Sequence, residues 1–95
     1  MNKNNKNNEK IPLVITTLHK GVFFGYGTPT TEKTIRLENA IMCLYWSVET
    51  KGVLGLASIG PQPGSKLTPA VPAITLQDVT SCMEASKVAE DKWIL

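Results

Sequence analysis

The stretch Pro12-Leu13-Val14-Ile15-Thr16-Thr17-Leu18 decides the fold class, because it is apolar and rich in β-branched residues. Such composition is typical of a β-strand. A second stretch of the same kind follows at once, Gly21-Val22-Phe23-Phe24-Gly25-Tyr26, with glycines near both ends. Two strands this close together indicate a mainly β chain.

The rest of the chain continues this pattern of short apolar runs separated by turn residues. We expect further strands over residues 34–37, 40–48, 52–59, 74–76 and 79–83, with a turn at 27–31 and a loop at 60–66. Residues 86–93 are expected to form a short C-terminal helix, with Ser86 as its N-cap and with Val88 and Ala89 facing inward. We therefore predict a small single-domain barrel or sandwich of about seven short strands.

The chain of 95 residues is long enough for one domain with a thin core. Small β domains often pair edges or faces with copies of themselves, so a homo-oligomer is expected. Residues 1–10 are almost all Asn and Lys and have nothing to bury. We expect them to form a disordered tail before a domain over residues 11–95.

Charge and cysteine content limit the range of possible functions. Residues 1–10 carry three of the ten basic and one of the eight acidic side chains, so residues 11–95 are neutral. A neutral body argues against binding of duplex nucleic acid. No signal peptide or spanning segment is evident, so a cytoplasmic protein with reduced Cys43 and Cys82 is expected. The two cysteines and His19 fit no zinc pattern, and no metal or other cofactor is predicted.

Two blocks of sequence recur in the same order. Lys20-Gly21-Val22 is followed by Ile35-Arg36-Leu37-Glu38-Asn39-Ala40, and Lys51-Gly52-Val53 is followed by Ile74-Thr75-Leu76-Gln77-Asp78-Val79. An internal duplication would place Leu37 and Leu76 in the core and Asn39 and Asp78 at chain reversals. Each half would be strand, strand, turn, strand, and the halves would close a barrel. Chance similarity is the alternative, because such units are common.

Several motifs in order resemble a family of short, uncharacterised tailed-phage and prophage proteins. They are His19-Lys20-Gly21-Val22-Phe23-Phe24-Gly25-Tyr26, Leu37-x-Asn39-Ala40, Tyr45-Trp46 and Lys51-Gly52-x-x-Gly55-Leu56-Ala57-x-x-Gly60-Pro61. The resemblance covers roughly residues 13–93. It implies a phage origin, a non-structural accessory role and a place in the host cytoplasm. It brings no assigned activity, so no residue role is carried over.

Candidate ligand contacts are few, and each has a structural alternative. His19 and the adjacent Lys20 precede a glycine and belong to a turn or rim, and no nucleophile or orienting acid accompanies the histidine, so catalysis is not predicted. Tyr45 and Trp46 point to opposite faces of one strand, which places one ring in the core and leaves the other for a partner, a ligand or a base.

The glycine-rich segment 52–66 could approach an anion through its backbone amides, aided by Ser58, Ser65 and Lys66. It lacks the order of a P-loop, and a plain rigid loop is the alternative.

These observations support a ranked set of functions. The first is a non-catalytic phage accessory protein that forms a small oligomer and sequesters a small anionic ligand, such as a nucleotide immune signal of the host. The second is a protein–protein interaction module that inhibits a host protein through an exposed apolar face. The third is a single-stranded nucleic-acid binder that uses the Lys-rich tail.

Overall fold

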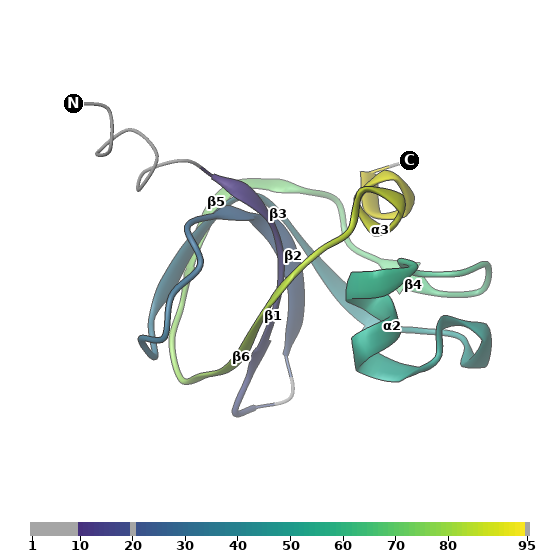
Figure 1. Ribbon diagram of the computed structural model, residues 1–95, viewed down its shortest axis with the longest axis horizontal. Helices are drawn as coiled ribbons and strands as arrows, with labels where there is room; N and C mark the ends of the chain where they lie inside the picture. Colours follow the sequence, from purple (N-terminus) through teal and green to yellow (C-terminus); the bar gives the residue numbers. More distant parts are fainter. Residues whose placement is uncertain (1–9, 20, 95) are drawn as a thin grey trace.

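Six antiparallel strands form one curved sheet in the computed structural model, which describes residues 10–19 and 21–94 (Figure 1). The strands are β1 (Ile11–Thr17), β2 (Val22–Gly27), β3 (Ile35–Tyr45), β4 (Lys66–Leu67), β5 (Val71–Leu76) and β6 (Val79–Glu84). The strand order is β4-β3-β2-β1-β6, and β5 pairs with the first half of β3. A 3-10 turn η1 (Val48–Thr50) and two helices, α2 (Gly52–Ser58) and α3 (Lys87–Ile94), complete the chain.

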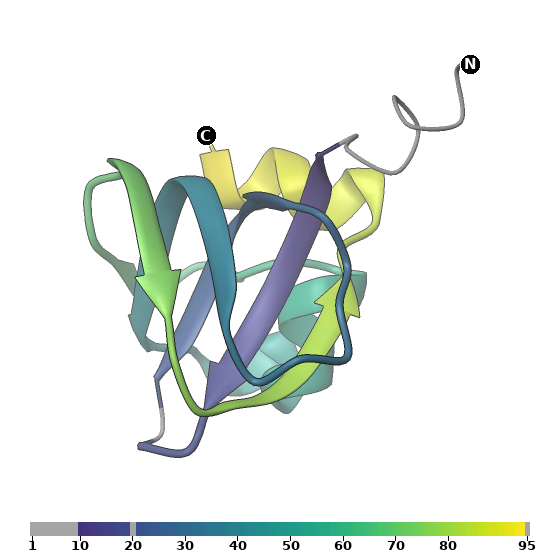
Figure 2. The same cartoon turned by 90° about the vertical axis from the view of Figure 1, so that its left-hand side faces the viewer.

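The predicted class is confirmed: the domain is small, mainly β and ends in a short helix. The predicted closed barrel is wrong. β5 and β6 lie at opposite edges of the sheet and are joined by the short turn Gln77-Asp78, yet no ladder links them among the residues described. Figure 2 shows the sheet curling towards itself without closing.

The sheet has a core on each face, because alternate residues of a strand point to opposite sides. In β1, Leu13 and Ile15 are buried on the face that the sheet curls around, and Val14 is buried on the other. Both helices cover this second face (Figure 1). The curled face holds Leu13, Ile15, Ile35, Leu37, Ala40 and Leu76. The helix face holds Val14, Val22, Phe24, Ile41, Cys43, Leu56, Ala57 and Trp93.

β3 is one continuous strand, where two strands broken at Asn39 were predicted. Between the pairs Phe24↔Ile41 and Tyr26↔Glu38, β3 contains one residue more than β2. Asn39 has a left-handed φ of 51°, which Asn tolerates better than most residues, so we assign it to a β-bulge. The bulge changes which residues face each side: Ile35 and Leu37 face the curled core before it, and Ala40 does so after it.

Residues 52–59, predicted as a fifth strand, instead form helix α2 and its C-terminal end. Its buried residues are Gly55, Leu56 and Ala57. A Cβ atom on Gly55 would lie 1.6 Å from the carbonyl oxygen of Thr50, so glycine allows α2 to pack against η1. Gly55 therefore serves a close contact between α2 and η1.

The C-terminal helix α3 confirms the prediction, including its cap: Ser86 Oγ accepts the Ala89 N–H at 3.0 Å. Ala89 is buried as predicted, but Val88 is 58% exposed, so its predicted inward position is wrong. Trp93 fixes α3 to the rest of the domain. Its indole N–H donates to the Leu56 carbonyl at 2.9 Å, and its ring stacks on Phe24 with centroids 5.1 Å apart.

The structure agrees with the proposed internal repeat at only a few positions. Leu37 and Leu76 are buried as predicted, and Asp78 lies in a turn with a left-handed φ of 57°. The second half, however, does not repeat the fold of the first, because Gly52 begins a helix. Lys20 and the predicted tail over residues 1–9 lie outside the described residues. Within the described part, no helix is long and apolar enough to span a membrane.

Candidate functional site

A hollow of about 270 Å³ lies where the start of β1, the loop after β2 and the start of β3 meet. Strand pairing explains its position. The pair Ile11↔Gly27 brings Lys10 beside Thr28, and the loop then returns the chain to Ile35 and Arg36. Because Ile35 is buried in the curled core, Arg36 takes the opposite face of β3. The hollow is lined by Lys10, Thr28, Thr30, Thr34, Ile35 and Arg36.

Two cations of this hollow share a single carboxylate. Lys10 Nζ lies 3.8 Å and Arg36 Nη2 lies 3.9 Å from the same oxygen of Glu38. The three side chains are 43%, 61% and 41% exposed in that order, so the group is hydrated and carries a formal net charge of +1. Threonine hydroxyls on the wall add hydrogen-bond donors. Charge and donors of this kind suit an anion.

The structure brings three of the predicted site residues together at the other end of β3. Tyr45 is paired with Lys66 across β3 and β4, and Ser65 precedes Lys66. Tyr45 is 58% exposed, whereas Trp46, which follows the end of β3, packs against the helix-side core, so one ring contacts the core and the other meets solvent. Base stacking on Tyr45 stays a prediction.

The glycine-rich loop before β4 is held by a buried network of hydroxyl groups. Ser65 Oγ accepts the Ser47 N–H at 3.0 Å and lies 3.5 Å from Thr50 Oγ1. Thr50, which is fully buried, accepts the Gln62 N–H at 3.1 Å. This arrangement fits the rigid-loop interpretation, because Ser65 already has partners within the fold. Ligand contact by Ser65 and Lys66 stays a prediction.

The remaining predicted contacts lie elsewhere. His19 is exposed in the turn after β1, Lys20 falls outside the described residues, and Ser58 ends α2. The six predicted residues that the structure describes therefore do not form one site. Among the described residues, no three His, Cys, Asp or Glu side chains group as metal ligands.

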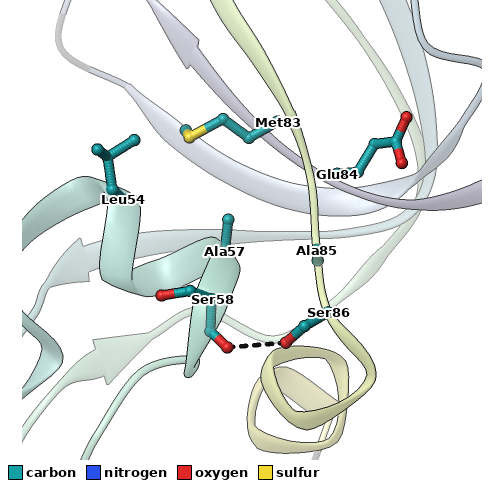
Figure 3. A pocket seen from close by; sticks show the side chains of 7 residues that line it. All are labelled: Leu54, Ala57, Ser58, Met83, Glu84, Ala85 and Ser86. Atoms are coloured by element: carbon teal, nitrogen blue, oxygen red, sulfur yellow. Dashed lines mark hydrogen bonds between the residues drawn. The ribbon is translucent and has the colours of Figure 1, made fainter.

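A second hollow, of about 500 Å³, lies between α2 and the end of β6 (Figure 3). Leu54 is 73% exposed beside it, and Met83 extends over it from β6, whereas the Glu84 side chain points away. Ser86 Oγ closes one end by donating to the Ser58 carbonyl at 2.8 Å. The lining residues are Leu54, Ala57, Ser58, Met83, Glu84, Ala85 and Ser86.

Two titrating groups are shifted by their surroundings. Tyr26 donates its hydroxyl to Glu90 on α3, and burial together with this carboxylate raises the pKa of Tyr26 to about 12. Burial also raises the pKa of the Cys43 thiol, opposed in part by a hydrogen bond from the backbone of Tyr45. Both shifts favour the neutral form, so neither group is activated for catalysis.

The hollow at Lys10 and Arg36 was not predicted from the sequence. Lys10 belonged to the expected tail, and alternating charges on β3 are typical of a solvated face. One available signal was composition, since residues 28–34 contain four threonines. The proximity of Lys10 to the threonine-rich loop becomes apparent only from the pairing of β1 with β2.

Fold and hollow together define a small, open-sheet β domain with a cationic, threonine-lined surface site. The chain belongs to the family described as a domain of unknown function, DUF6948, whose family model matches residues 10–93. No curated protein and no solved structure matches the chain.

Proposed function

We propose that this domain is a non-catalytic protein that binds a small anionic molecule. The observation that carries the proposal is the convergence of Lys10 and Arg36 on one threonine-lined hollow. Its volume of about 270 Å³ falls just below the roughly 300–1,000 Å³ of typical ligand pockets, which favours one anionic group of a small molecule.

Binding is favoured over catalysis by the chemistry of the lining. Threonine hydroxyls become nucleophiles only beside a base, and none of the six lining residues is a histidine, a cysteine or a carboxylate. His19, the one histidine of the chain, does not line this hollow. A site of cations and hydroxyls can hold an anion without transforming it.

The proposal also includes the biological setting, a phage protein that acts in the host cytoplasm. The resemblance to phage proteins supports an accessory role in the host cytoplasm, where sequestration of a nucleotide-derived defence signal requires only binding. The small core and the outer edge of β5, which among the described residues pairs only with β3, support self-association into a small oligomer.

A thermal-shift panel of cyclic and linear nucleotides tests the proposal. A ligand at 100 times its Kd adds about 2.7 kcal/mol, which raises the Tm of a domain this size by roughly 10–20 °C. Arg36→Gln and Lys10→Gln should abolish the shift. Lys66→Gln is the matched variant, since it removes the same charge at the other end of β3.

The outcome of that comparison is decisive. Loss of the shift in Lys66→Gln alone would move the site to the Tyr45–Lys66 end of the sheet. A flat response to every anion in the unaltered protein would refute the proposal.

A protein-binding function is the second candidate, favoured by the exposed Leu54 beside the apolar hollow of Figure 3. Leu54→Asp should then abolish capture of one stoichiometric host protein while leaving the Tm nearly unchanged. Val48→Asp provides a control, because Val48 is 81% exposed and does not line that hollow. Equal capture by both variants would rule out this hollow as the docking site.

A further inference from the structure

A further hollow, of about 640 Å³, lies between the C-terminal helix α3 and the strands β3 and β4. We infer that it holds the uncharged ring of a ligand whose phosphate is bound by Lys10 and Arg36, so that the ligand is a nucleoside monophosphate. This inference rests on the proposed function and deepens it by naming the ligand class. The residues that line this ring hollow are Tyr26, Asn39, Ile41, Leu67, Thr68, Ala70, Trp93 and Ile94.

The size and the lining of the ring hollow suit an uncharged, flat group. Its volume lies within the roughly 300–1,000 Å³ of typical ligand pockets. None of the eight lining residues is charged, so an ionised group placed there would lose its hydration without gaining an ionic partner. Ile41, Leu67 and Ile94 contribute apolar surface against which a ring can pack.

Three polar side chains of the ring hollow can still form hydrogen bonds with a ligand. Asn39 makes no side-chain hydrogen bond with the described residues, so its amide can both donate and accept. Thr68 Oγ1 accepts the Met42 N–H at 3.0 Å and keeps its own proton to donate. Tyr26 donates its hydroxyl to Glu90, so its phenol oxygen can accept. A nucleobase presents donors and acceptors on one edge in the same way, whereas a hydrocarbon ring would leave these groups without partners.

Strand register places the ring hollow beside the two cations. Tyr26 pairs with Pro12 on β1 and with Glu38 on β3, and directly paired residues point to the same face of a sheet. Lys10 and Arg36 each lie two residues before one of these partners, so they take the face of Tyr26 one row closer to the strand ends. The ion pairs of both cations with Glu38 agree with this shared face.

The separation of the two hollows fits a mononucleotide. Two residues along a strand span about 7 Å, which is the distance between the row of cations and the row of Tyr26. The sugar of a mononucleotide separates its phosphate from its base by a comparable length. Figure 2 shows α3 lying across the end of the sheet at which β1 begins, which is also the end that carries Lys10. One small molecule can therefore occupy both hollows.

The donors at the cationic hollow match a phosphate. The Arg36 guanidinium can bond two oxygens with its planar fork, and the Lys10 ammonium acts as a point charge. A threonine hydroxyl of the lining, such as that of Thr34, can donate to a third oxygen. A carboxylate has only two oxygens and so matches fewer of these donors.

The test is an NMR titration at low salt with the four ribonucleoside 5′-monophosphates, their nucleosides and inorganic phosphate. At least one nucleotide should bind about tenfold or more tightly than inorganic phosphate and than its own nucleoside, because the two linked groups bind as one molecule. That nucleotide should shift the backbone amide signals of both Thr34 and Ile94, which line different hollows. Inorganic phosphate should shift the signal of Thr34 and leave that of Ile94 in place.

Asn39→Gly tests the ring hollow separately from the cations, because glycine tolerates the left-handed φ of 51° while the amide is removed. It should lower the affinity for the nucleotide about three- to tenfold and leave the affinity for inorganic phosphate unchanged. Arg36→Gln should lower both affinities. Gln77→Ala is the matched control, since it removes an exposed amide that lines neither hollow, and it should change neither affinity.

The possible failures have different meanings. Binding of inorganic phosphate with no nucleotide bound more tightly, or an equal loss of phosphate and nucleotide binding in Asn39→Gly, would overturn the inference and leave anion binding in place. Absence of binding by every probe would refute the proposed function as well. The comparison of probes on the unaltered protein depends on no variant, and far-UV circular dichroism checks that each variant is folded.

Discussion

One hydroxyl group connects the two helices of this domain. Ser86 Oγ accepts the Ala89 N–H at the start of α3 and donates to the Ser58 carbonyl at the end of α2 (Figure 3). Helix ends leave such N–H and C=O groups without partners inside the helix. Ser86→Ala should therefore weaken both helix ends at once.

The expected loss follows from these two hydrogen bonds. Replacing an N-cap serine by alanine costs about 0.5–2 kcal/mol, and the bond to the exposed Ser58 carbonyl adds about 0.5 kcal/mol. We expect a total of about 1–2.5 kcal/mol, which urea unfolding followed by circular dichroism resolves. For a domain of this size the Tm should fall by roughly 4–20 °C.

Ser58→Ala is the matched control. Ser58 contributes its backbone carbonyl to the bond, and its own side chain makes no hydrogen bond with the described residues. The substitution should change the free energy of unfolding by less than about 0.5 kcal/mol. An equal loss in the two variants, or no loss in Ser86→Ala, would refute the role assigned to the hydroxyl.

Three further predictions follow from single groups. Asn39→Val should lower the free energy of unfolding, measured in urea, by about 1–2 kcal/mol, because Asn39 has a left-handed φ. Asn39→Gly should leave it nearly unchanged. Equal effects of the two substitutions would contradict the assigned bulge. The pKa of Tyr26 is raised in the folded state, so its contribution to stability is complete below pH 10 and is lost as the pH rises towards about 12. Unfolding measured across this range should show the loss, and Tyr26→Phe should remove that component. Ellman's reagent should label Cys82, which is half-buried, before the buried Cys43, whose thiol pKa is raised; simultaneous labelling of the native protein would exclude this order.

The strands that could be predicted are those whose local pattern agrees with their final burial. β1 and β2 are apolar and β-branched, and they form the centre of the sheet. The helix α3 was evident from Ser86, since a serine cap before a helix-forming segment is a local signal. Val88 was misplaced because the side of a short helix that faces the core depends on where the helix lies against the sheet.

The local sequence of residues 52–58 does not show that they form helix α2. Its short apolar run Val53-Leu54-Gly55-Leu56-Ala57 fits a strand or a helix, and periodicity does not distinguish them at this length. One contact that holds this segment is tertiary: Trp93 donates to the carbonyl of Leu56 from the far end of the chain. No local rule contains this partner.

The candidate site shows a second limit of prediction from sequence, which is that net charge does not reveal local charge. The near-neutral body argues against a long polyanion, because such a partner samples the charge of a whole face. It says little about a small anion, which senses only charges within about one Debye length, roughly 8–10 Å. Lys10 and Arg36 can therefore form a cationic site while acidic residues such as Glu90 and Asp91 balance them from α3. Strand pairing determines which charges become neighbours, and for that reason the ligand class proposed here follows from the fold and not from the charge sum.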